Sequence, residues 1–271
     1  MRRLAAALLL VLGGCAKQVA LDPARPEPVA VEPTLDGPVV PLEGTLAIPR
    51  AAWAPFTEAC RTSTATVTGP PVPVPDAARQ VCANVRGEML ADGAARIVFT
   101  PRQLSAAQLS VSLVRQADGS VSAPELGGSL LARASPEERA QLERLIPPFA
   151  TGFALPPSVT QGTRYGLSAG ALPGGAEVAV TCQVVGAGRL GGRAVVVSDC
   201  DGASLVDRPA DANGVAVKGS VLVHGRLTHD VETGLVLAGT LAVLMPATIA
   251  NIRSGRSTEA TISLRESTLL R

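Results

Sequence analysis

The sequence predicts a mainly β protein of the α+β class, with antiparallel hairpins forming its sheet or sheets and one clear helix near residues 135–146. Two observations support this prediction. β-Branched and apolar runs recur along the chain, separated by turns that contain Gly or Asp. Hydrophobic residues make up 46% of the chain but aromatic residues only 2%, so the core must consist mainly of Val, Leu and Ala.

Hairpins are expected along most of the chain after residue 83. Each one joins two apolar runs across a short turn, such as Ala91-Asp92-Gly93. The expected pairs are 84–90 with 94–100, 109–115 with 120–123, 177–185 with 193–198, and 214–227 with 234–244. A last strand is expected over 260–264.

The helix is expected to begin at Ser135, whose side chain can cap the first turn. Pro136 suits the first helical position, and Glu138 completes a capping box. Apolar residues then recur at helical spacing as far as Ile146, and Pro147 ends the helix. We interpret it as a structural helix that packs on a sheet.

Residues 1–14 have the organisation of a secretory signal peptide. Arg2 and Arg3 precede an apolar run that is much too short for a membrane helix. The run ends in Leu12-Gly13-Gly14-Cys15, which resembles the lipobox of bacterial lipoproteins. That resemblance implies cleavage before Cys15 and acylation of its thiol, for example with palmitate. An ordinary secretory leader with an incidental cysteine is the alternative.

Lipidation at Cys15 would make the membrane the first partner of the chain. Ala16 replaces the aspartate that retains enteric lipoproteins in the inner membrane, which favours the outer membrane and a domain facing the periplasm. Removal of Arg2 and Arg3 changes the formal net charge from +1 to −1, so nothing in the charge attracts nucleic acid. A lipid or protein of the envelope is the other expected partner, and no cofactor is expected.

The mature chain divides into a lipidated cysteine with a proline-rich linker over 15–49 and a β-rich periplasmic domain over 50–271. The domain contains two possibly related halves, 50–134 and 150–271. Each half has a cysteine pair about 20 residues apart and a Val-x-Gly sequence, namely Val85-Arg86-Gly87 and Val223-His224-Gly225.

The cysteines that remain after Cys15 are interpreted as disulfide-bonded, because their number is even in an exported protein. They are Cys60, Cys82, Cys182 and Cys200. Three pairings are possible, and we favour Cys60–Cys82 with Cys182–Cys200, which closes two loops of about 20 residues. A metal site is the alternative, but no CxxC sequence or Cys/His cluster supports one.

Two glycine motifs resemble catalytic or cofactor signatures. Residues 186–191 match GxGxxG, but a β-branched run follows instead of the helix that holds a pyrophosphate, so a glycine-rich hairpin turn is expected. Residues 166–170 match GxSxG around Ser168. The nucleophile elbow requires a helix after the serine, whereas 171–175 contain Pro and two Gly. The hydrolase alternative would combine Ser168 with His224 or His229 and one of Asp199, Asp201 or Asp207.

His224 and His229 are the only histidines. Five positions apart on a strand, they should point to opposite faces and make poor metal co-ligands. His229 is expected to be solvated at a turn beside Asp230. The uncharged run over 234–252 is long enough to span a membrane, but Gly239 and Pro246 interrupt it, so a buried strand and a loop are expected.

Two segments resemble a family of uncharacterised β-rich bacterial lipoproteins. One is 155–165, with a proline pair, a Val-x-x-Gly turn and Tyr165, where that family more often has Trp. The other is 230–239, with its Asp-x-x-Thr-Gly sequence. The family supplies no function.

A non-enzymatic role in the cell envelope is therefore the favoured function. The module would be structural, would act in assembly, or would cup an apolar ligand such as a lipid. The low aromatic content argues against sugar and single-stranded nucleic acid, which stack on aromatic rings. An envelope serine hydrolase using Ser168 is the alternative.

Overall fold

Antiparallel strands dominate the structure, a computed structural model that describes residues 34–49, 54, 56–69, 74–116, 118, 120–135, 155–169, 178–211 and 213–271. The first meander contains β2 (Glu58–Thr68), β3 (Val74–Met89), β4 (Ala95–Pro101), β5 (Ser110–Arg115) and β6 (Glu125–Gly127). The second contains β8 (Arg164–Ala169), β9 (Val178–Leu190), β10 (Arg193–Arg208), β11 (Val215–Asp230), β12 (Val236–Asn251) and β13 (Arg256–Leu270). Two short strands, β1 (Leu46–Ala47) and β7 (Ser158–Val159), form a separate pair.

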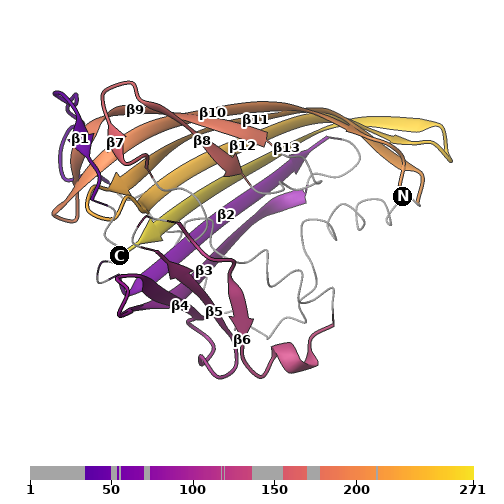
Figure 1. Cartoon of the computed structure of the whole chain (residues 1–271). Coiled ribbons are helices and arrows are strands. Elements are labelled where there is room, and N and C mark those ends of the chain that lie inside the picture. Colours follow the sequence, from indigo (N-terminus) through magenta and orange to yellow (C-terminus); the bar gives the residue numbers. More distant parts are fainter. Residues whose placement is uncertain are drawn as a thin grey trace.

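The two meanders form one 11-stranded sheet in the order β6-β5-β4-β3-β2-β13-β12-β11-β10-β9-β8. Neighbouring strands follow one another in sequence except where β2 pairs with β13. The long strands β9–β13 arch over the first meander, and their far ends extend beyond β4–β6 (Figure 1).

The sheet curls around a single core. We call the face that encloses this core the inner face and the opposite face the outer face. The same apolar cluster contains Ile97 and Leu113 from the first meander and Val180, Val223 and Val243 from the second. Strands near the two edges of the sheet therefore face each other across the core.

Glycines on the inner face let neighbouring strands approach closely. A Cβ atom on any of them would press against the next strand; they are Gly202, Gly219, Gly225 and Gly239. At Gly225, a Cβ would meet the carbonyl oxygen of Thr240 and lie 2.6 Å from Leu241 Cδ2. We infer that this glycine is part of what permits the tight curl.

A second apolar layer packs on the sheet at the β9–β10 turn. Val196 packs there with Ile48 and Val159, whereas its neighbours Val195 and Val197, which point to the other face of the strand, belong to the main cluster. This layer contains the β1–β7 pair and the chain that leads into it.

Residues 34–49, which the sequence assigns to the linker, are attached to the sheet. Asp36 accepts hydrogen bonds from the backbone amides of Gly191 and Gly192 at 3.2 and 2.7 Å. Val40 and Ala187 exchange backbone hydrogen bonds at 2.9 and 2.8 Å. The prediction of a linker that reaches residue 49 is therefore wrong, because its apolar residues pack on the sheet.

Both disulfides form in the favoured pairing. Cys60 lies directly opposite Cys82 in the β2–β3 hairpin, and Cys182 lies opposite Cys200 in the β9–β10 hairpin. Their Cα atoms are 4.1 and 3.9 Å apart, close to the separation of a non-hydrogen-bonded antiparallel pair. Each disulfide therefore links two adjacent strands.

We expect the double substitution Cys182→Ala/Cys200→Ala to lower the free energy of unfolding by about 2 to 3 kcal/mol, because the disulfide closes a short loop. Urea denaturation followed by circular dichroism measures this change. An unchanged urea midpoint would show that the hairpin's backbone and side-chain contacts suffice without the bond.

The mainly β class is confirmed, and the expected hairpins of β3–β4, β9–β10 and β11–β12 are present with longer strands. The expected hairpin of 109–115 with 120–123 forms in part. A bridge joins Arg115 to Val121, and Ser122 N donates to the carbonyl oxygen of Val114, but the regular pairing of β5 is with β6, further along the chain. The helix expected over 135–146 lies, apart from Ser135, outside the described residues. Within them the only helical element is a 3-10 turn, Leu131–Arg133.

One sheet contains strands from both expected halves, 50–134 and 150–271. The two Val-x-Gly sequences are not placed equivalently. Val85-Arg86-Gly87 lies on β3 with Cys82, whereas Val223-His224-Gly225 lies on β11, outside the disulfide-bonded β9–β10 hairpin. A relation between the halves stays a prediction.

Candidate functional site

The turn between β11 and β12 holds a buried polar cluster. The Asp230 carboxylate accepts hydrogen bonds from Thr233, at 2.9 Å from the backbone N and 2.7 Å from Oγ1. Arg193 donates to the same carboxylate from Nε at 3.0 Å and Nη2 at 3.2 Å. The hydrogen bond to Asp230 raises the pKa of Arg193, so this contact favours the charged form of the arginine.

Arg115 joins the first meander to this turn. Its side chain is only 1% exposed, and its Nη2 donates a hydrogen bond to the carbonyl oxygen of Thr233 at 2.5 Å. Arg115 lies on β5, near one edge of the sheet, while Thr233 follows β11. This long-range contact closes the curled sheet at one end, a structural role.

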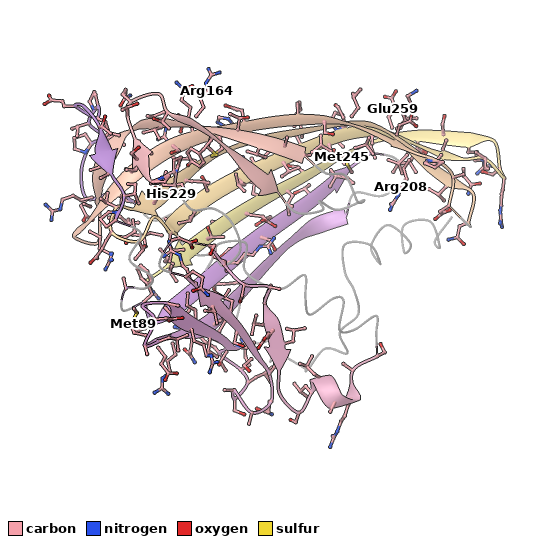
Figure 2. All side chains as sticks on the ribbon, viewed as in Figure 1. Met89, Arg164, Arg208, His229, Met245 and Glu259 are labelled. Atoms are coloured by element: carbon pink, nitrogen blue, oxygen red, sulfur yellow. A yellow bond between two sulfur atoms is a disulfide. The ribbon has the colours of Figure 1, made fainter. Side chains whose placement is uncertain are left out.

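His229 is fully buried, so the prediction that it is solvated at a turn is wrong. β11 continues to Asp230, which keeps His229 within the strand rather than in the turn. Its Nε2 lies 3.5 Å from Oη of Tyr165, with the two rings edge-on. Figure 2 shows His229 near the β1–β7 end of the sheet, far from Arg208 at the opposite end.

Burial raises the pKa of Tyr165 from 10.0 to about 12, an effect that Ser198 partly offsets. The folded state therefore favours the neutral phenol. The contribution of the neutral Tyr165 phenol to the free energy of unfolding is complete below pH 10 and is lost as the pH rises from 10 to 12. We expect a loss of up to about 2 to 3 kcal/mol in this range.

Absorbance of tyrosinate at 295 nm tests this expectation, because Tyr165 is the only tyrosine in the chain. Tyr165→Phe should abolish this part of the pH dependence of unfolding. A titration midpoint near pH 10 in the folded protein would contradict the effect of burial.

Glu58, Cys60 and Cys82 are the one metal-like cluster among the described residues, with candidate ligand atoms within 4.8 Å of one another. The two sulfurs are joined in a disulfide and offer no thiolate. The Glu58 carboxylate is paired with Arg102 and Arg271. With the disulfide formed, this cluster therefore does not make a metal site. Glu58 instead links Arg271 to β2.

The residues of the hydrolase alternative are spread over the sheet. Ser168 lies on β8 opposite Ala179, whereas His224 lies on β11. Three strand spacings separate their backbones, about 14 Å. His224 Nδ1 contacts Asp201 at 2.7 Å on the outer face, whereas His229 is buried. The described residues do not bring the expected serine, histidine and aspartate together.

Ion pairs link β10 and β11 on the outer face. Asp199 accepts from Arg226 Nε and Nη2 at 2.7 and 3.1 Å. Asp201 and His224 form the next row, and Asp207 lies 4.0 Å from Lys218 in a further row. All three pairs occupy directly opposite positions in the ladder. Each acidic group therefore has a basic partner across the strand.

An apolar strip lies between these charged rows. Ala203, Leu222 and Leu244 are direct register partners across β10, β11 and β12. Leu205 is 85% exposed, Leu222 47% and Leu244 43%. We define the apolar strip as these exposed residues together with their exposed neighbours: Ala203, Leu205, Leu222, Ala242, Leu244 and Pro246. The strip was not predicted from the sequence. Along their strands, Leu222 lies on one face with Ser220 and His224, and Leu244 lies on one face with Ala242 and Pro246.

On the inner face, Arg61 of β2 forms an ion pair with Glu266 of β13. Both side chains are partly buried, and Leu264 packs on the core beside them. Nε of Arg61 is buried and has no hydrogen-bond partner in the described part of the chain. This pair places charge midway along an otherwise mostly apolar face.

The glycine motif at 186–191 is not a phosphate-binding loop. β9 continues to Leu190, and the turn consists of Gly191 and Gly192. The uncharged run after Gly234 forms the expected strand, β12. The expected loop is wrong, because β12 continues through Pro246 to Asn251, with side chains that alternate between exposed and buried over 242–248. In the described ranges no helix is both long and apolar enough to cross a membrane.

Comparisons of the chain with protein-family models, with curated proteins and with solved structures find no match. The resemblances to the lipobox and to β-rich lipoproteins stay predictions. Cys15, the leader and residues 15–33 of the linker lie outside the described residues.

Proposed function

We propose that this chain is a lipoprotein of the bacterial cell envelope, anchored through Cys15, whose folded part acts by contact and not by catalysis. The anchor rests on Leu12-Gly13-Gly14-Cys15 and the short leader before it. Acylation with two or more chains would make attachment effectively permanent. The outer membrane, with the domain in the periplasm, follows from Ala16.

The apolar strip is the observation that favours a contact function. Exposed aliphatic side chains in register across three strands, with ion pairs on both sides, are typical of an interaction surface. The buried polar side chains, by comparison, serve the fold: Asp230 and Arg115 stabilise one end of the sheet. This division of roles supports a structural or assembly protein.

An apolar ligand on the inner face is the second candidate. A curled sheet lined by Val243, Met245 and Ile262 suits an acyl chain, and Arg61 beside it suits an anionic head group. The buried Nε of Arg61 is the specific observation that favours this candidate.

Native mass spectrometry of the Cys15→Ser protein, purified from the periplasm of its own or a related host, distinguishes the two candidates. If the chain is a contact module, its measured mass should be that of the protein alone, with no bound small molecule. A stoichiometric apolar adduct that is lost in Arg61→Ala would instead show that the chain carries an apolar ligand. Turnover of ester substrates that disappears in Ser168→Ala would contradict both and restore the hydrolase.

A further inference from the structure

We infer that the apolar strip rests on the lipid bilayer to which the chain is tethered, an inference that builds on the proposed lipid anchor. The partner is thus a membrane surface of low charge, contacted by the outer face of β10–β12. The anchor alone would leave the domain free to move at the end of its linker, whereas the strip would give it one orientation.

The place where the tether meets the domain makes this contact possible. Asp36 is held at the β9–β10 turn by Gly191 and Gly192. From Gly192 to Leu205 the β10 strand advances about 43 Å at its rise of roughly 3.3 Å per residue. Residues 15–33 reach about 60 Å when extended at ~3.1 Å per residue. The tether is therefore long enough for Cys15 and the strip to occupy the same membrane.

The chemistry of the strip favours lipid over a protein partner. Its residues are aliphatic, and it contains none of the Trp, Tyr and Arg side chains that dominate protein-binding hot spots. Acidic groups beside it face basic groups across the ladder, as Asp199 faces Arg226 and Asp207 faces Lys218. On the β13 side, the exposed Arg265 lies opposite Ala242 and adds one positive charge at the border.

The contact needs little intrinsic affinity, because a short tether supplies an effective concentration in the millimolar range. Each leucine that enters the interface strengthens partitioning roughly tenfold. Leu205, Leu222 and Leu244 are exposed enough to enter it without any change in the fold.

Neutron reflectometry on a supported phosphatidylcholine bilayer tests the inference. The mature chain is exported with a leader that is not lipidated, so that Cys15 keeps a free thiol. A maleimide lipid in the bilayer then couples to Cys15, because Cys60, Cys82, Cys182 and Cys200 are in disulfides. The chemical tether makes the result independent of acylation in the cell.

The protein layer is expected to contact the lipid head groups. In Leu205→Ser/Leu222→Ser/Leu244→Ser the layer should move outward by on the order of 20 Å, near the r.m.s. length of a flexible chain of 19 residues. Met89→Ser, which replaces another exposed apolar side chain away from the strip, should behave as the unsubstituted chain does.

Two results would overturn the inference. One is that the layer of the unsubstituted protein already lies as far from the bilayer as the layer of the triple variant. The other is a stable dimer in sedimentation velocity before coupling that the triple substitution dissociates, which would assign the strip to a second copy. Failure of Cys15 acylation in the cell, with head-group contact retained here, would count against the proposed anchor alone.

Discussion

Gly225→Val is expected to lower the free energy of unfolding by about 4 kcal/mol or more, enough to prevent folding of a marginally stable domain. The new Cβ would lie 2.6 Å from Leu241 Cδ2 and 3.0 Å from Leu241 Cα, and would meet the carbonyl oxygen of Thr240. Two of these atoms belong to the backbone of β12, so relief requires separation of β11 from β12. Urea denaturation and the yield of soluble protein measure the effect.

Gly166→Val is the matched control. Gly166 also lies within a strand, β8, but a Cβ there would have no atom within 4 Å. The substitution should be neutral or slightly stabilising, because valine favours the extended backbone. Equal losses for the two variants would show that glycine at 225 is not needed for the close approach of the strands.

Arg115→Ala should cost about 4 kcal/mol of stability. The substitution removes a fully buried side chain, leaves a cavity and deprives the carbonyl oxygen of Thr233 of a donor. It also removes a link between β5 and the β11–β12 turn, so the first meander should become the first part to open. Hydrogen exchange of the β4 and β5 amides measures that opening.

Arg226→Ala provides the comparison for an exposed arginine. Arg226 forms a bidentate pair with Asp199 on the outer face, where solvent screens the interaction. We expect a loss below about 1 kcal/mol. A loss as large as that of Arg115→Ala would mean that the outer ion pairs, and not the buried contact, hold the sheet.

The parts of the fold that the sequence predicts are those encoded locally. Ala91-Asp92-Gly93 and the turn after Asp230 lie between apolar runs, and both hairpins formed where expected. β2 was missed because its sequence is rich in Thr and Ser and lacks a long apolar run. The composition of residues 34–49 predicts a linker because prolines interrupt the apolar positions that pack on the sheet.

The candidate sites were less predictable, because they depend on contacts between distant segments. Cysteine spacing indicated both disulfides, since each pair lies in a single hairpin. The burial of Arg115 depends on a curl that brings β5 to Thr233, and no local pattern encodes that approach. His229 was misassigned because β11 continues past the point where the expected strand ends.

The intact mass of the protein extracted from host membranes tests the central claim, the lipid anchor at Cys15, most directly. The account predicts a chain that begins at Cys15 and carries the added mass of a diacylglyceryl group, with or without a third acyl chain. Cys15→Ser should lose that mass and leave the membrane fraction. A chain of unmodified mass in the membrane fraction, or one that retains residues 1–14, would contradict the account.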